Sequence, residues 1–357
     1  MKKNITDWNK VMAKLGGSGT GKARRIDVED MKAKLKERVK GQDEIIDDLC
    51  DYIYTQWGKE NRSKPIANVL FLGPTGTGKT ELALALAAYL YDDEANLLGF
   101  DCGELQSPES ITRLIGMPAG YEGTKAGGQL TRPVITNPKR IVVFDEIEKA
   151  FSRVNDLFLS MMDKGRVTEA AGKVADFTQC VIILTSNAEF EAIAKLEREI
   201  KDPNERVQAI KDQLAEAGTF RPEIVARIDK IYVFKPLPRE VMATIVVLKV
   251  TKLAHEYGLE LEYVDADLVV EAVEKSEARK KFGVRELTRV VNDMFSRPLV
   301  MAKEAGHKHI SVTASDDGVL QVLPAEPEAD EAEAAPQIAV DPSATIVAPG
   351  QRRLDPK

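Results

Sequence analysis

Five short apolar runs alternate with helical segments between about residue 66 and residue 235. The runs occupy residues 68–72, 96–100, 141–144, 180–184 and 231–234, and each is apolar at nearly every position. Such runs are typical of strands that are buried on both faces. Because helical segments separate them, the pattern predicts an α/β fold in which helices sandwich a parallel sheet.

Helical patterns flank the predicted sheet on both sides. Met31, Leu35 and Val39 recur at four-residue steps from residue 28, and a second apolar helix follows Gly41. Beyond the sheet, two prolines at 236 and 238 mark a boundary. A mostly helical stretch and a predicted hairpin around Asp316-Asp317-Gly318 follow them.

The composition along the chain divides it into four parts. Residues 1–30 contain a Gly/Ser-rich stretch and predict a flexible arm, and residues 324–357 are acidic and too poor in apolar residues to fold alone. Between them we predict a large domain over residues 31–235 and a smaller, mostly helical domain over residues 236–323.

Overall composition excludes several classes of protein. The chain has 357 residues, of which 43% are hydrophobic, so a wholly disordered protein is excluded. Fifty basic and 57 acidic residues give a net charge of −7, which argues against bulk electrostatic binding to nucleic acid or anionic lipid but leaves a local basic patch open. Cys50, Cys102 and Cys180 lie too far apart for zinc or a disulfide framework and indicate a reduced, cytoplasmic protein. No run is apolar and long enough to predict a membrane helix, and none follows the basic N-terminus as in a signal peptide.

A phosphate-binding loop is the strongest local signal. It lies between a predicted buried strand and a segment of strong helix formers, and it reads Gly73-Pro74-Thr75-Gly76-Thr77-Gly78-Lys79-Thr80. Its glycines let backbone N–H groups converge on phosphate oxygens at the positive end of a helix. Lys79 would reach the β- and γ-phosphates of ATP, and the Thr80 hydroxyl would bind Mg²⁺.

A second, similar stretch is the weaker candidate. Residues 16–22 also fit the first part of the motif, but Ala23 stands where a hydroxyl residue is needed, and no buried strand precedes them. Lys22 therefore has neither a metal-binding neighbour nor a scaffold, and we interpret this stretch as a linker.

Two carboxylates end the predicted strand at residues 141–144. Asp145 would hold Mg²⁺ and Glu146 would polarise the attacking water, which are the two requirements of phosphoryl transfer to water. The alternative is a solvated helix start, since acidic residues favour the first turn of a helix. The position about 65 residues after the phosphate loop favours the catalytic interpretation.

The combined motifs resemble the AAA+ ATPases of the Clp unfoldase family, most closely the second ATPase module of ClpB-type disaggregases. The resemblance extends from about Leu35 to Val322. Besides the phosphate loop it depends on Arg38-Val39-Lys40-Gly41-Gln42-Asp43, Gly120-Tyr121-Glu122-Gly123, Phe144-Asp145-Glu146-Ile147-Glu148-Lys149-Ala150, Leu184-Thr185-Ser186-Asn187, Phe220-Arg221-Pro222-Glu223 with Ala226-Arg227-Ile228-Asp229, and Gly283-Val284-Arg285-Glu286-Leu287.

This resemblance implies roles for five further residues. Val39 and Gly41 would pack on adenine, and Asn187 would help to place the attacking water. Arg227 would be an arginine finger that reaches the γ-phosphate bound by a neighbouring subunit, and Arg285 would be a second sensor of the nucleotide. The plainer alternatives are a strand-ending Asn in a turn, a surface Arg227 paired with Asp229 or Glu223, and a solvated Arg285.

The resemblance also implies a substrate-gripping loop. In the family, an aromatic residue in this loop lines a central pore and contacts an extended polypeptide, a role that Tyr121 would take between Gly120 and Glu122. A Tyr ring can contact many kinds of side chain. The plainer reading is a surface turn with a half-buried Tyr. Glu122 stands where the family usually has an apolar residue, which leaves the type of substrate open.

The resemblance further implies which partners to expect. No peptidase-docking tripeptide occurs between Ala188 and Thr219, so a ClpP-type peptidase is not expected. The expected cofactors are ATP and Mg²⁺, and the expected partners are further copies of this chain in a homohexamer, a protein substrate and an adaptor. The leading hypothesis is thus an ATP-driven unfoldase that threads protein through a ring.

Two other functions remain open. A AAA+ switch that acts on DNA would need a basic surface or a helix-turn-helix appendage, and neither is evident in the sequence. A scaffold that uses nucleotide only to assemble would not need Lys79, Asp145, Glu146 and Arg227 together.

Overall fold

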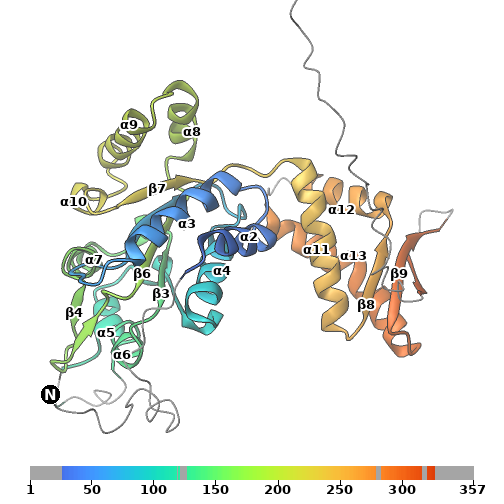
Figure 1. The fold of residues 1–357 in the computed structure, drawn as a ribbon, viewed down its shortest axis with the longest axis horizontal. Helices are drawn as coiled ribbons and strands as arrows, with labels where there is room; N and C mark the ends of the chain where they lie inside the picture. The colour runs from blue at the N-terminus through green and yellow to red at the C-terminus, as the bar shows by residue number, and fades with distance from the viewer. Residues whose placement is uncertain (1–25, 119, 121–126, 279–282, 316–319, 326–357) are drawn as a thin grey trace, which may run out of the picture.

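The computed structural model describes residues 26–118, 120, 127–278, 283–315 and 320–325. The predicted pore residues Tyr121 and Glu122 lie outside the described residues, as do most of the predicted arm and tail. Two domains are visible in Figure 1, a large one built on a sheet and a smaller one that begins with α11 (Arg239–Glu256).

A five-stranded parallel sheet forms the centre of the large domain, as predicted. Its strands are β1 (Ala67–Leu72), β2 (Leu97–Asp101), β3 (Ile141–Asp145), β6 (Val181–Ser186) and β7 (Lys230–Val233), in the order β2-β3-β6-β1-β7. All four neighbouring pairs are parallel. Every residue of β1 and β6 is buried, whereas β2, at the edge, is only partly buried.

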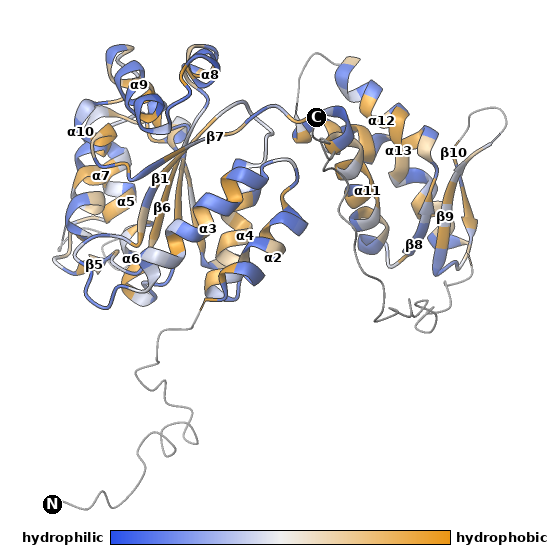
Figure 2. Cartoon of the chain, turned by 45° about the horizontal axis from the view of Figure 1, so that its top comes forward, coloured by the Kyte–Doolittle hydropathy of each residue, from blue (hydrophilic) through white to orange (hydrophobic). Residues whose placement is uncertain are grey.

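Helices cover both faces of this sheet (Figures 1 and 2). One face is covered by α2 (Val28–Arg38), α3 (Asp43–Trp57) and α4 (Lys79–Tyr91); the other carries α5 (Glu109–Ile115), α6 (Thr131–Thr136), α7 (Ser152–Lys164), α8 (Phe190–Glu199), α9 (Pro203–Glu216) and α10 (Pro222–Val225). Alternate strand residues enter the two cores. Phe144 and Leu184 face one, and Val143 and Ile183 face the other.

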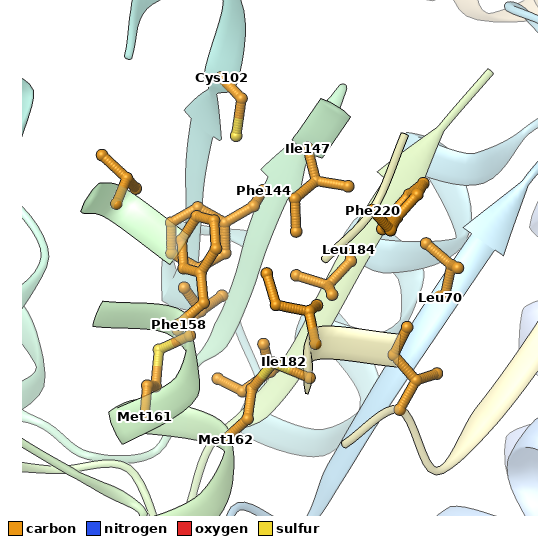
Figure 3. Packing of buried hydrophobic residues seen from close by; sticks show 14 of the residues in the cluster. Leu70, Cys102, Phe144, Ile147, Phe158, Met161, Met162, Ile182, Leu184 and Phe220 are labelled. Atoms are coloured by element: carbon orange, nitrogen blue, oxygen red, sulfur yellow. The ribbon is translucent and has the colours of Figure 1, made fainter. Parts of the chain in front are cut away.

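Aromatic and sulfur-containing side chains are prominent in the core that Phe144 and Leu184 enter (Figure 3). The ring of Phe144 lies 4.4 Å from that of Phe158, centroid to centroid, and Met161 and Met162 of α7 are fully buried beside them. Burying one such side chain contributes about 1.5–3 kcal/mol. The core therefore fixes α7 against β3, the strand that ends in Asp145.

The small domain contains more strand than the sequence predicted. Its helices α11, α12 (Ala266–Ala278) and α13 (Val284–Glu304) form a third core with the sheet β10-β9-β8. The predicted hairpin is confirmed as β9 (His309–Ala314) and β10 (Leu320–Pro324). The strand β8 (Glu260–Val264), parallel to β9, was missed because its alternating charged residues do not stand out within a helical stretch.

A small hairpin in the large domain was also missed. Its strands are β4 (Arg166–Thr168) and β5 (Val174–Asp176), which pair antiparallel. Each strand has three residues and buries only its central one, Val167 or Ala175, so the sequence carries almost no apolar signal.

The first helix begins within the range that the sequence assigned to the arm. The side chain of Asp27 accepts hydrogen bonds from the N–H groups of Glu29 (3.1 Å) and Asp30 (3.2 Å), and it thereby caps α2 at Val28. Residues 28–30 are therefore helical. At the other end, β10 includes Pro324, one residue beyond the predicted boundary.

All three cysteines are buried thiols in the described part of the chain. Burial raises the pKa of Cys50 and of Cys180 to about 12, and it raises that of Cys102 as well. Such thiols are unreactive at neutral pH. Across the residues that the structure describes, no helix has both the length and the apolar character of a membrane span.

Candidate nucleotide-binding site

A cavity of about 1380 Å³ lies where the large and small domains meet. It is lined by residues 75–80 of the phosphate loop, by the ends of β3 and β6, and by one face of α11 and the start of α13. It brings together many of the residues that the sequence selected, namely Val39, Thr75, Gly76, Thr77, Gly78, Lys79, Thr80, Asp145, Glu146, Asn187 and Arg285.

The phosphate loop joins β1 directly to α4, as its motif requires. Gly78 precedes the first residue of α4, so the N–H groups of that first turn face the cavity with the positive end of the helix. Gly76 has a φ of +79°, and a Cβ there would lie 2.9 Å from the backbone nitrogen of Val284. Only glycine therefore permits both this backbone conformation and the close approach of α13.

A backbone hydrogen bond joins the phosphate loop to the small domain. The N–H of Val284, the first residue of α13, donates to the carbonyl of Gly76 over 2.9 Å. Arg285 is the next residue and lines the same cavity. A group bound at the loop would therefore contact the start of α13 as well. Its binding would depend on the angle between the two domains.

The Lys79 ammonium is turned toward the backbone of its own loop. It donates to the carbonyl oxygens of Gly73 (2.7 Å) and Pro74 (2.8 Å). Burial lowers its pKa to about 8, although the carboxylates of Asp145, Glu148 and Glu146 act in the opposite direction. Phosphate oxygens would supply the negative charge that this buried cation lacks.

Replacing Lys79 with alanine is expected to weaken ATP binding at least about a hundredfold. Each charged hydrogen bond to phosphate contributes about 1.5–3 kcal/mol, and two are lost. Titration with a fluorescent ATP analogue measures the effect. Lys22→Ala, in the similar stretch near the N-terminus, is the matched control and should bind like the unchanged protein. Equal affinities for both variants would contradict the assignment of the loop.

Asp145 and Glu146 diverge at the end of β3. Asp145 bonds through Oδ1 to the hydroxyl of Thr185, and that hydroxyl oxygen also accepts the N–H of Glu146 over 3.2 Å. Glu146 has a φ of +53°, a left-handed conformation that is rare for residues other than glycine. The turn separates the two carboxylates, so that Asp145 can contact a metal ion while Glu146 contacts a water molecule.

The Glu146 carboxylate has one partner on each oxygen. Oε2 pairs with the Lys149 ammonium over 2.5 Å, and Oε1 accepts a 3.3 Å hydrogen bond from the Asn187 amide. The second contact joins the predicted catalytic base to the predicted polar sensor. A water that enters the cavity would compete for Oε1, because this is the longer of the two contacts.

Thr80 and Asp145 suit a magnesium ion. The hydroxyl and the carboxylate are oxygen ligands of the kind that Mg²⁺ prefers, and both residues line the cavity. Gly41 and Pro74 do not line it. Gly41 packs against Val241 of α11 instead, and the contribution of Pro74 is its carbonyl bond to Lys79.

Sequence reasoning missed two residues that hold the site together. Thr185 was part of a quoted motif, but its bond to Asp145 depends on the pairing of β3 with β6. Gln42 is 4% exposed, and its amide donates to the carbonyls of Thr77 (3.3 Å) and Lys235 (2.9 Å). It therefore joins the phosphate loop to the segment between the domains. Gln42 belongs to the motif Arg38-Val39-Lys40-Gly41-Gln42-Asp43, but that motif does not indicate its two partners.

Arg227 lies away from the cavity. It donates to the carbonyl of Glu223 over 2.7 Å and pairs with Asp163 at 3.5 Å. Asp229, the other partner considered, accepts instead from the backbone of Asn68. Within one chain, Arg227 thus has the local contacts of a surface residue, and it can reach a nucleotide only if that nucleotide is bound by another copy.

Comparisons with known proteins extend over both domains. A family model described as AAA domain (Cdc48 subfamily) matches residues 64–231. A second model, described as Hsp20/alpha crystallin family, matches residues 241–341, a span that overlaps the small domain and continues past the described residues.

Curated relatives and a solved structure are similar over most of the chain. Chaperone protein ClpB of Meiothermus ruber is 41% identical over 277 residues, which is 74% of this chain and 31% of the relative. The ClpB of Rhodopirellula baltica is 36% identical over 276 residues, or 76% of this chain and 31% of the relative. A closed-state cryoEM reconstruction of Hsp104 with ATPγS and FITC-casein has a TM-score of 0.69 and 27% identity, and the match covers 90% of this chain and 53% of that one. The chain spans about a third of the length of these curated relatives.

Proposed function

Because this chain is a Clp-type AAA+ protein related to the modules of ClpB and Hsp104, we propose that it hydrolyses ATP in order to unfold or remodel other proteins. One observation carries the proposal: a single cavity gathers residues 75–80 of the phosphate loop, the carboxylates of Asp145 and Glu146, Asn187 and Arg285. Charge neutralisation and an aligned water are what hydrolysis of ATP requires, and these groups can supply them.

The residues of the cavity have defined tasks in this proposal. Residues 75–80 bind the phosphates, Glu146 orients and polarises water, and Asn187 holds Glu146 in place through its amide. Thr80 and Asp145 would hold Mg²⁺, which supplies positive charge against the phosphates. Val39 lines the side of the cavity where adenine would lie. Arg285 would contact the nucleotide from α13 and so link its presence to the position of the small domain.

The active form in this proposal is a homohexameric ring. Arg227 is exposed to about 30% and does not line the cavity of its own chain, which suits a residue that acts on the nucleotide of a neighbour. A ring of identical subunits repeats one such interface around its circumference. Hydrolysis would then require assembly.

Several partner assignments belong to the same proposal. Residues 188–219 hold α8 and α9, and the only candidate tripeptide, Leu98-Gly99-Phe100, lies inside β2, so we propose that no ClpP-type peptidase docks on this chain. An adaptor would bind the arm or tail. The buried, reduced cysteines favour the cytoplasm.

Substrate contact by Tyr121 can be tested separately from ATP hydrolysis. Tyr121→Ala is expected to keep ATP turnover within about twofold while unfolding of a protein substrate falls at least about tenfold. The aromatic side chain would contact the substrate polypeptide and would take no part in ATP hydrolysis. Unfolding of a fluorescent model protein and phosphate release are measured in parallel. Tyr121→Phe is the matched control and should unfold like the unchanged protein. Equal unfolding by Tyr121→Ala would remove the pore assignment.

A further inference from the structure

The hairpin β4–β5 carries a buried carboxylate that the proposed ATP reaction does not use. Glu169 comes directly after β4, is only 6% exposed, and does not line the nucleotide cavity. A buried carboxylate is costly unless its oxygens are hydrogen-bonded. Its partners therefore indicate what the residue is for.

Among the described residues, two groups donate to the Glu169 carboxylate, and both lie at one place outside the hairpin. Its Oε1 accepts the N–H of Gly128 over 3.1 Å and the hydroxyl of Thr131 over 3.4 Å. Thr131, the first residue of α6, has no exposed surface. The carboxylate thus holds the chain where it enters α6, directly after the segment that contains Tyr121.

The two ends of that segment form a closed stem, which we define as residues 113–116 and 127–130. Two backbone hydrogen bonds cross it, from the N–H groups of residues 129 and 130 to the carbonyls of Arg113 (2.9 Å) and Leu114 (3.1 Å). A Cβ on Gly128 would lie 2.2 Å from the carbonyl oxygen of Leu114, so the two sides of the stem are in direct contact.

The hairpin bonds to both sides of the stem. Glu169 holds Gly128 on one side, and the N–H of the next residue, Ala170, donates to the carbonyl of Ile115 on the other over 2.9 Å. Two consecutive residues of the hairpin, Glu169 and Ala170, therefore hold opposite sides of the stem. Of these two attachments, only the one from Glu169 depends on a side chain.

The hairpin is also joined to the strands of the nucleotide site. Along the chain, α7 follows the carboxylates at the end of β3 and leads through Gly165 into β4, and β5 then leads into β6, which bears Thr185. The N–H of Phe177 donates to the carbonyl of Gly165 over 2.7 Å and closes the base of the hairpin. A change at the nucleotide can thus reach the stem through one helix and one hairpin.

We propose that Glu169 is a positioning residue that fixes this stem to the β4–β5 hairpin and so couples ATP turnover to pulling on the protein substrate. The consequence for pulling depends on the proposed function. The attachment of the stem depends only on the hydrogen bonds of described residues. The two parts are therefore tested by different measurements.

Hydrogen exchange tests the attachment. In Glu169→Ala, the backbone amide of Gly128 loses its acceptor and should exchange about tenfold to a hundredfold faster, as expected for loss of a charged hydrogen bond. Glu169→Gln keeps an oxygen acceptor and should retain most of the protection. Lys173→Ala, at an exposed position of the same hairpin, is the control. Unchanged protection of Gly128 in Glu169→Ala would overturn the inference.

Activity tests the coupling. Substrate unfolding by Glu169→Ala is expected to fall at least about tenfold while ATPase stays within about twofold, and Glu169→Gln should restore unfolding. Equal loss of both activities, or of neither, would overturn the coupling. Should Glu169→Ala not fold, Thr131→Val removes one of the two donors and should show the same split at about threefold. If the unchanged protein unfolds no substrate, the proposed function fails, and the exchange at Gly128 still decides whether Glu169 holds the stem.

Discussion

Replacing Glu146 with glutamine is expected to lower the ATPase rate at least about a hundredfold while ATP affinity changes little. A positioned general base contributes about 10²–10⁴ in rate, and an amide cannot accept the proton of the attacking water. The substitution keeps the size of the side chain and an oxygen at the place where Asn187 donates. Steady-state phosphate release and equilibrium binding of a fluorescent ATP analogue measure the two quantities separately.

Glu37→Gln is the matched control for this prediction. Glu37 lines the same cavity from α2, is exposed, and has no role in the proposed reaction. Its substitution should leave turnover within about twofold, because a surface carboxylate there changes the local charge only slightly. If Glu146→Gln turned over ATP like this control, Glu146 would not be the base.

A hydrolysis-deficient ring also provides a way to identify the substrate. Glu146→Gln should stay in its ATP-bound state and retain whatever protein it has engaged, because release follows hydrolysis in the proposed cycle. A pull-down in the native host with ATP, compared with the Lys79→Ala variant that should bind nucleotide only weakly, distinguishes retained substrate from background.

The fold could be predicted well where burial leaves a dense apolar signal. The interior strands of the large sheet are buried on both faces, so their sequences are apolar at nearly every position, and the ends of each were placed to within two residues. The two hairpin strands around Val167 and Ala175 bury one residue each, and the sequence pattern did not predict them. The same physical cause, partial burial, hid β8 at the edge of the small sheet.

The nucleotide site was predictable where one motif carries several constraints together. The phosphate loop needs its glycines, its lysine and its hydroxyl in one order, so its sequence alone selected residues 75–80, all of which line the cavity. Thr185 and Gln42 act by joining segments that are far apart along the chain. Their partners are set by strand pairing and by domain contact, neither of which a single sequence records.

Arg227→Ala is expected to lower the ATPase rate by about 10³–10⁵ with little change in nucleotide affinity, as for arginine fingers in other nucleotide hydrolases. The side chain contacts Glu223 and Asp163 in its own chain and lies outside its own cavity, so loss of affinity is not expected. Arg198→Ala, on α8, is the matched control and should turn over ATP within about twofold. Full turnover by isolated monomers of the unchanged protein would remove the need for a neighbour.

Mixing two inactive variants tests directly whether Arg227 acts across the seam between subunits. In a ring that contains both Arg227→Ala and Glu146→Gln subunits, an interface is complete when the first binds ATP and the second supplies its arginine. Random mixing makes about a quarter of the interfaces complete, since each interface of a cyclic ring takes different surfaces from its two subunits. The mixture should therefore regain up to about a quarter of full activity, although each variant alone is nearly inactive. If no activity returned in rings shown to contain both variants, Arg227 would have to act within its own chain, although it does not line the cavity of that chain.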